Sequence, residues 1–213
     1  MRKKLFTAFL CVAMIAAFFA GCGNSTEEGK APEAGTFAAA SAEDVAAALQ
    51  DSSAVVVDAR SNDAYAGWAA GDNKLGGHID GATDFSAKWL TATFDDENNL
   101  DGMTREEHLQ KYMTDKGIKA DTPVIVYDEN GTDAVAVAEY FAANGVTDIK
   151  TFNLADWKED LVTYANYQLY IPPAAVNDLI SGKEVAELGA VKDLKILEIS
   201  WGKTEESGYL AGH

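Results

Sequence analysis

A loop in the middle of the chain carries the most distinctive group of chemically active side chains. It consists of Asp128, Glu129, Asn130, Gly131, Thr132 and Asp133. Three of the six residues are acidic, none is basic and none is a cysteine. An aspartate at the first position of such a loop can act as a nucleophile toward phosphorus. Because loop amides can also converge on an anion, the side chain at this position decides the chemistry.

The sequence around the loop predicts the elements that position it. Residues 124–127 form a short apolar run rich in β-branched side chains, typical of a strand buried on both faces of a parallel sheet. Apolar residues recur at helical spacing at positions 134, 137, 138, 141 and 142, and Gly145 stands where a left-handed cap is expected. The loop is therefore predicted to join a strand to a helix, where unpaired amides gather and active sites of α/β proteins usually lie.

Segments on either side of this unit predict alternating strands and helices. Strands are expected at residues 54–60 and 148–152, and helices at residues 42–49, 104–117 and 154–161, with a helical turn at 61–68. Capping boxes at Ser41 and Thr104 mark two of the helix starts. This alternation predicts an α/β fold with an open parallel sheet and helices on both faces.

Two further groups of residues could belong to a site, but structural roles are expected for both. Asp58 and Arg60 end a predicted strand and are expected to form a structural ion pair, or a pair that binds the loop, rather than to contact substrate. In residues 76–82, Gly77 and Gly81 permit tight backbone on both sides of His78 and the isoleucine after it. His78 is expected to be a hydrogen-bonded turn residue.

No metal and no cofactor are expected. The chain has three histidines, too few to suggest a zinc site without cysteine ligands. Residues 97–102 faintly resemble a calcium loop, but His108 stands where that loop needs a bidentate glutamate.

The first residues predict export and attachment to a membrane. Three cations precede an apolar run at residues 5–20, which is followed by Gly21 and Cys22. This pattern is typical of a secretory signal, and its end resembles a bacterial lipobox. We expect residues 1–21 to be a signal peptide, Cys22 to bear lipid in the cell envelope, facing outside the cytoplasm, and residues 22–36 to be a disordered tether.

Charge and cysteine content restrict the function further. Without the three signal cations, the 17 basic residues fall to 14 against 34 acidic ones, a net charge of about −20, so nucleic acid is an unexpected partner. The two cysteines are Cys11, in the predicted signal, and Cys22, the predicted lipid site. The mature domain is therefore expected to have neither a free thiol nor a disulfide.

An aspartate-based phosphatase is one functional alternative. The loop from Asp128 to Thr132 resembles the phosphoryl-accepting loop of haloacid-dehalogenase-type phosphatases. Asn130 replaces the second aspartate of that loop, however, and no later acidic pair for magnesium stands out. This alternative is less favoured.

The order of motifs resembles the rhodanese family over residues 37–161. The sequence runs from VVVDAR through a turn containing Tyr65 to GGHIDGA, then through VIVYD to a helix ending in NGV, a strand and a tryptophan. The resemblance implies an open parallel sheet and sulfur transfer through a cysteine persulfide at the first loop position. In this chain Asp128 occupies that position, and an aspartate cannot form a persulfide.

The resemblance also implies how this loop interacts with anions. The Asp128 carboxylate is expected to occupy the amide nest in place of the sulfur anion and so to stabilise the fold. Thiosulfate would meet Asp128, Glu129 and Asp133 with no positive residue in the loop. One like-charge contact at ~4 Å costs ~4 kcal/mol at an effective dielectric constant of about 20. Catalysis by the loop is therefore not expected.

An internal repeat predicts the beginning of a second, similar unit. Residues 41–49 are echoed at 173–180, VVVDAR at 196–201 and the GGH at 76–78 by the final Ala-Gly-His. Offsets of 140 and 135 residues match one rhodanese module. The expected organisation is a complete domain at residues 37–163, a linker at 164–173 and an incomplete second domain at 174–213, with a C-terminal extension packed on the first domain as the alternative.

Taken with the resemblance, these features predict a thiosulfate sulfurtransferase-type protein whose first domain is inactive. Activity is expected in a catalytic domain beyond the present chain. Its expected partners are membrane lipid at Cys22, its own second domain and a small sulfur anion. A binding or structural module without enzymatic activity is the main alternative.

Overall fold

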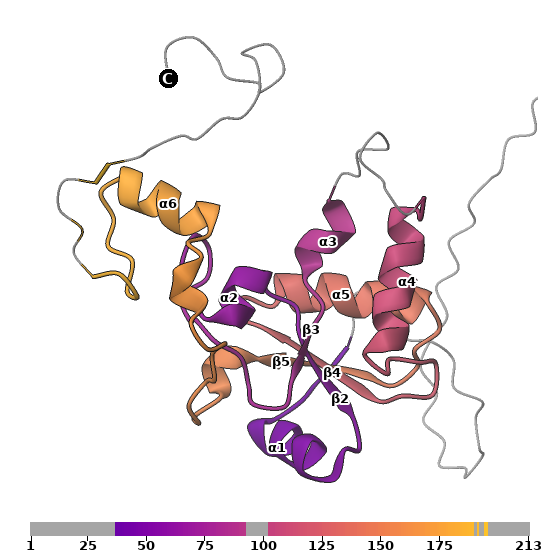
Figure 1. The fold of residues 1–213 in the computed structure, drawn as a ribbon. Helices are drawn as coiled ribbons and strands as arrows, with labels where there is room; N and C mark the ends of the chain where they lie inside the picture. The colour runs from indigo at the N-terminus through magenta and orange to yellow at the C-terminus, as the bar shows by residue number, and fades with distance from the viewer. Residues whose placement is uncertain (1–36, 93–101, 190, 192–193, 196–213) are drawn as a thin grey trace, which may run out of the picture.

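The computed structural model describes residues 37–92, 102–189, 191 and 194–195 (Figure 1). Within these residues five strands form one sheet in the order β1-β5-β4-β2-β3, and every neighbouring pair is parallel. The strands are β1 (Ala38–Ala39), β2 (Val55–Asp58), β3 (Thr83–Asp84), β4 (Val124–Asp128) and β5 (Ile149–Asn153). The predicted fold class, an open parallel α/β sheet, is confirmed. The predicted strand and signature of a second unit, at 196–213, lie outside the described residues.

Helices cover both faces of this sheet, as predicted. They are α1 (Ala42–Asp51), α2 (Asn62–Ala66), α3 (Ala87–Thr91), α4 (Arg105–Asp115), α5 (Thr132–Ala143) and α6 (Pro173–Ile180), with short 3₁₀ turns at Leu154–Asp156 and Tyr167–Leu169. α1 lies on one face, and α3, α4 and α5 lie on the other (Figure 1). The predicted capping boxes are present at Ser41 and Thr104, where each hydroxyl accepts a hydrogen bond from the third helical residue.

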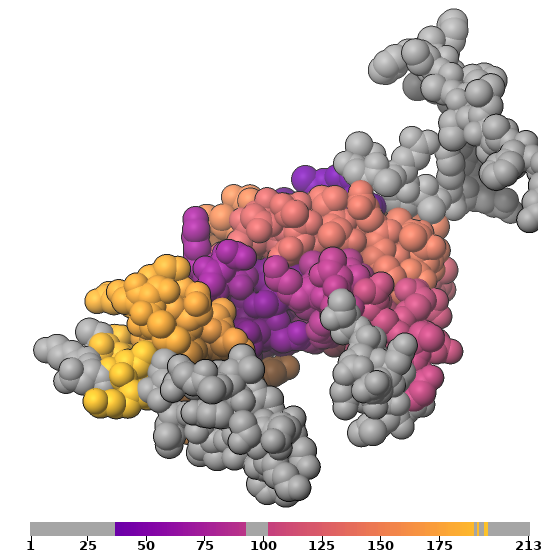
Figure 2. Space-filling view, turned by 90° about the horizontal axis from the view of Figure 1, so that it is seen from above, coloured from indigo at the N-terminus to yellow at the C-terminus, as the bar shows by residue number. Residues whose placement is uncertain are grey.

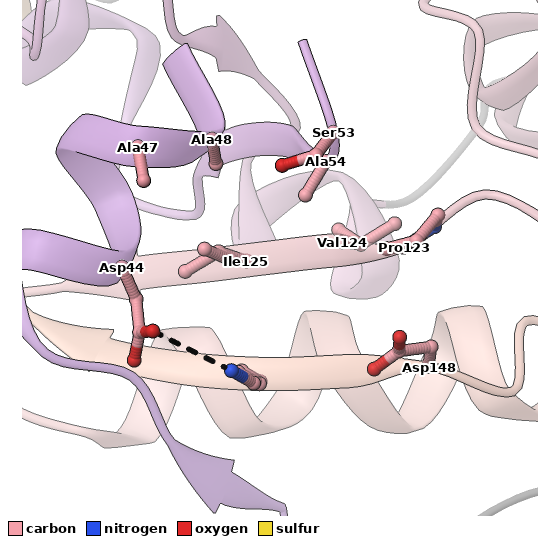
Figure 3. A pocket seen from close by; sticks show the side chains of 10 residues that line it. Asp44, Ala47, Ala48, Ser53, Ala54, Pro123, Val124, Ile125 and Asp148 are labelled. Carbon is pink, nitrogen blue, oxygen red and sulfur yellow. Dashed lines mark ion pairs between the residues drawn. The ribbon is translucent and has the colours of Figure 1, made fainter. Parts of the chain in front are cut away.

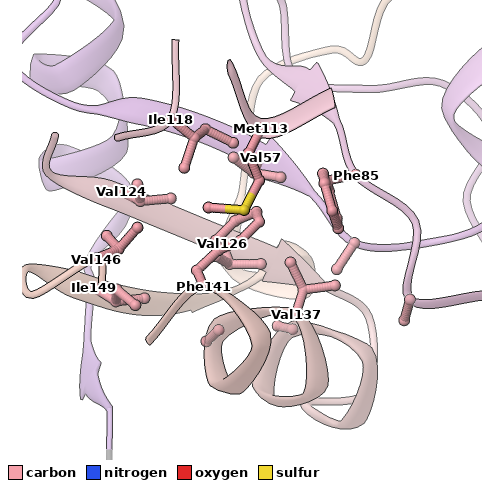
Figure 4. Close-up of a cluster of buried hydrophobic side chains, with 14 of the residues drawn as sticks. Val57, Phe85, Met113, Ile118, Val124, Val126, Val137, Phe141, Val146 and Ile149 are labelled. Atoms are coloured by element: carbon pink, nitrogen blue, oxygen red, sulfur yellow. The ribbon is translucent and has the colours of Figure 1, made fainter. Parts of the chain in front are cut away.

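Two apolar cores hold these layers together. The larger lies between the sheet and helices α3 to α5 and centres on β4 and α5 (Figure 4). The other lies under α1 and includes Ile79 and Phe152. All five residues of β4 are buried, which agrees with a strand covered on both faces.

The predicted helix at 154–161 is wrong. Only Leu154–Asp156 form a 3₁₀ turn, capped by the Asn153 side chain, and the backbone becomes extended at Trp157. The chain is extended because Val162 exchanges two backbone hydrogen bonds with His78, at 2.8 and 2.9 Å. This tertiary pairing overrides the local helical pattern.

Residues 164–189 pack against the first domain. Ala175 of α6 and Val185 are buried with Trp68 and Ala70 in a small third core. The backbone of the loop after α2 also donates hydrogen bonds to two carboxylates of this segment, Ala69 to Glu187 and Gly71 to Asp178. In Figure 2 the orange and yellow segment accordingly abuts the purple surface of the domain.

Candidate functional site

Asp128 is the last residue of β4 and is almost fully buried, with 1% of its surface exposed. Its two carboxylate oxygens point back into the following loop. Oδ1 accepts a hydrogen bond from the Gly131 amide at 2.7 Å, and Oδ2 accepts one from the Ala134 amide at 2.8 Å. The carboxylate therefore lies within the amide nest that the loop forms at the start of α5.

The loop adopts this shape because its own side chains satisfy its amides. Gly131 has a φ of 77°, a left-handed conformation that favours glycine, and it is the N-cap of α5. Asn130 Oδ1 accepts a hydrogen bond from the Thr132 amide at 2.8 Å. With the two bonds to Asp128, three amide groups around the turn are bonded to side chains of the same loop.

Arg60 is the buried cation of the site. Its guanidinium donates hydrogen bonds to Asp58 from Nε and Nη2. Nη1 donates to the Leu75 carbonyl oxygen and, at 2.9 Å, to Glu129, and Nη2 also donates to the Gly77 carbonyl oxygen. Each of its five N–H groups thus has an acceptor. Burial lowers the pKa of Arg60, but its bonds to Asp58 and Glu129 outweigh burial and raise it above the usual value. Arg60 stays charged and joins β2 to the loop after β4.

Glu129 is the loop residue that Arg60 contacts, which agrees with the expectation that Asp58 and Arg60 form an ion pair or a pair that binds the loop. Its carboxylate accepts hydrogen bonds from Arg60, from the Lys74 amide at 2.8 Å and from the Leu75 amide at 3.1 Å. The expectation of no positive group in the loop omitted Arg60, which lies 69 positions earlier and reaches the loop from the neighbouring strand. Knowledge that β2 pairs with β4 would have brought these two strand ends together.

A small pocket of about 110 Å³ opens beside Arg60 and Glu129. Its lining is strongly mixed in charge and consists of Arg60, Ser61, Asp72, Asn73, Lys88, Glu129, Asn130 and Asp133. Burial raises the pKa of Asp133, the nearby Lys88 opposes this, and the charges of Asp128, Asp72 and Asp58 raise it further. Lys88 is a second cation near the loop that the sequence reading did not place there.

The glycine-rich segment, residues 76–82, contacts this site through the Gly77 carbonyl oxygen, which accepts a hydrogen bond from Arg60. His78 is buried, its ring stacks on Tyr65 at 3.8 Å between centroids, and its Nδ1 lies 2.7 Å from the Tyr65 carbonyl oxygen. A Cβ added at Gly77 would lie 2.7 Å from the Val162 carbonyl oxygen, so a side chain there would break the bridge to His78. Gly81 has a φ of 84° and closes the turn. None of these residues lines the small pocket.

A larger hollow lies at the opposite end of the strands, where β4 and β5 begin. It measures about 300 Å³ and contains the Asp44–Lys150 ion pair, whose atoms are 3.8 Å apart (Figure 3). Pro123 and Val124 line it at the start of β4, whereas the acidic loop follows the end of that strand. The larger of these two pockets is therefore not the one beside the acidic loop.

Among the described residues, no group of three or more His, Cys, Asp or Glu side chains could hold a metal ion. No described helix is both long and apolar enough to cross a bilayer. Cys22 and the calcium-like positions 97–101 lie outside the described residues.

Comparison with known families identifies the family to which this chain belongs. A family model described as "Rhodanese-like domain" matches residues 41–158, which is more than half of the chain. The chain belongs to the rhodanese-like family. The match covers α1 through the residues just after β5, and so includes the acidic loop and the glycine-rich segment. In this rhodanese-like domain the residue after the VIVY run is Asp128.

Solved structures agree in fold. An anaerobic ergothioneine biosynthesis enzyme from Chlorobium limicola, in complex with its natural substrate trimethyl histidine, is 26% identical with a TM-score of 0.57. The match covers 71% of this chain and 34% of that chain. An EanB variant with ergothioneine covalently linked to a persulfide cysteine is 25% identical with the same TM-score and the same coverage. The chain thus spans about a third of the length of these structures. The comparison with curated proteins gave no match.

Proposed function

We propose that this chain is a non-catalytic rhodanese-like module of a thiosulfate sulfurtransferase-type protein. One observation carries the proposal: the Asp128 carboxylate occupies the amide nest after β4, with both oxygens bonded to loop amides. A carboxylate oxygen cannot accept and release a sulfane sulfur atom as a thiolate does. The related ergothioneine structure with a persulfide cysteine supports the comparison, because persulfide chemistry needs a thiol.

The same geometry disfavours the aspartate-based phosphatase. A nucleophilic carboxylate must present a free oxygen to phosphorus, but Asp128 is almost fully buried and both its oxygens accept amide hydrogen bonds. Asp128 lines a separate pocket of about 190 Å³ together with Gly131 and Ala134, but the amides of these two residues already hold both of its oxygens. Attack by Asp128 would therefore require the loop to open and lose both bonds.

In this proposal, sulfur transfer belongs to a second rhodanese-like unit that begins within residues 174–213. The packing of α6 and Val185 against Trp68 and Ala70 is consistent with a second unit that docks on the first, and equally with a C-terminal extension packed on the first domain. We further propose that lipid at Cys22 holds the protein at the bacterial cell envelope, outside the cytoplasm. A purely structural or binding module remains the alternative, and it is favoured if the second unit also lacks a cysteine after its central strand.

The sulfur-transfer assay tests this proposal. The purified processed chain from Cys22, given thiosulfate and cyanide, is expected to form thiocyanate no faster than a solution without protein. A Cys22→Ser variant controls for a thiol left unacylated, and a rhodanese with its loop cysteine controls for the reagents. Turnover by the Cys22→Ser chain above the blank would contradict the inactive role of Asp128.

A further inference from the structure

The carboxylate of Glu129 is bound as an anionic ligand would be bound. It extends from the acidic loop into a set of donors supplied by other segments. These are Arg60 Nη1 at 2.9 Å and the Lys74 and Leu75 amides at 2.8 and 3.1 Å. A guanidinium beside two converging backbone amides is a common arrangement for binding carboxylates and other oxyanions.

We infer that Arg60, Lys74 N–H and Leu75 N–H form a binding site for a small, singly charged oxyanion, filled in this chain by Glu129. The inference rests on this geometry and not on the proposed function. It assigns Glu129 the role of an internal occupant that excludes free anions from the site.

Arg60 is fixed independently of Glu129, and its Nη1 also binds the carbonyl oxygen of Leu75, the residue that supplies one of the two amide donors. Arg60 is 1% exposed, and its remaining four N–H groups are held by Asp58 and by the carbonyl oxygens of Leu75 and Gly77. The loop that carries Glu129, in contrast, exposes Asn130 and the two residues after it. Truncating Glu129 is therefore expected to leave the donors aimed at one vacated position.

A small anion would have both the space and a route to enter the position that the Glu129 carboxylate vacates. Arg60 and Glu129 both line the pocket of about 110 Å³. Removing the Glu129 side chain would join the vacated volume to that pocket and give a small anion a route to the donors.

Charge selects the class of ligand. Besides Arg60 and Glu129, the charged groups lining the pocket are Lys88, Asp72 and Asp133, while Asp58 is paired with Arg60. The native arrangement accommodates one negative charge at the Glu129 position. A singly charged carboxylate such as acetate restores that balance, whereas doubly charged thiosulfate adds a further repulsion from Asp72 and Asp133.

The test compares thermal unfolding of full-chain variants in sodium acetate and in sodium chloride, at equal ionic strength and pH. Glu129→Ala is expected to unfold about 2–4 °C higher in acetate once acetate exceeds its dissociation constant several-fold. Glu129→Gln should show no such rise, because its amide still fills the position. Glu159→Ala, at an exposed glutamate, controls for general salt effects.

Each outcome decides the proposal. A rise in Glu129→Ala no larger than in Glu159→Ala overturns it. If Glu129→Ala does not fold in chloride, recovery of native circular dichroism in acetate supports the site, and failure to fold in both salts overturns it. Since the readout is stability and not sulfur transfer, a negative result leaves the account of Asp128 unchanged.

Discussion

Replacing Arg60 with methionine is expected to lower the free energy of unfolding by about 3–5 kcal/mol. The substitution keeps much of the side-chain volume but removes all five donors. Asp58, which is fully buried, would lose its Nε and Nη2 partners and remain as an uncompensated charge. The carbonyl oxygens of Leu75 and Gly77 and the Glu129 carboxylate would lose a donor as well. Urea denaturation at neutral pH measures the loss.

Arg105→Met is the matched control for this experiment. Arg105 is exposed at the start of α4, and its guanidinium donates to the Ala92 carbonyl oxygen at 3.0 Å. Its loss is expected to change stability by no more than about 0.5 kcal/mol. Equal losses in the two variants would show that the buried network around Arg60 does not hold the loop in place.

Replacing Asp128 with alanine is expected to lower the free energy of unfolding by about 2–4 kcal/mol. The change leaves two amides at the start of α5 without their acceptor, that of the buried Ala134 and that of the exposed Gly131. Denaturation gives the total loss, and hydrogen exchange locates it, because these two amides should exchange faster in the variant than in the parent.

Asp121→Ala is the control for Asp128→Ala, since Asp121 is exposed in the turn before β4. Asp128→Asn should recover only part of the lost stability. Its side-chain oxygen can accept one of the two hydrogen bonds, but its NH2 group is a donor and would face a backbone N–H. An Asp128→Ala protein as stable as the parent, with unchanged exchange at Gly131 and Ala134, would refute the nest-filling role of the carboxylate.

The central elements of the fold could be read from the sequence because their signals are local. The apolar run of β4, the capping boxes at Ser41 and Thr104 and the helical spacing of α5 are each contained within a dozen residues. Strands β1 and β3 were not predicted, because each has only two residues and β1 consists of two alanines. Their pairing with longer strands, and not their own composition, places them in the sheet.

The candidate site was also predicted only in part. The position of Asp128 at the end of a strand follows from a local pattern, and the resemblance to rhodaneses implied that its carboxylate lies among the loop amides. The contact between Arg60 and Glu129 depends on the pairing of β2 with β4 and on the course of residues 69–77, which no local pattern encodes. For this reason the sequence reading counted only the charges of the loop itself and did not include Arg60.

The most direct test of the central claim is mass spectrometry of the chain from residue 22 with Cys22→Ser, which holds no cysteine, after incubation with thiosulfate or a persulfide donor. We predict no mass increase of one sulfur atom, because oxygen stands at the position where this family carries sulfur. The Asp128→Cys variant, which restores a thiol at that position, serves as the positive control for sulfur loading. A sulfur adduct on the chain that retains Asp128, mapped to residues 128–134, would contradict the account.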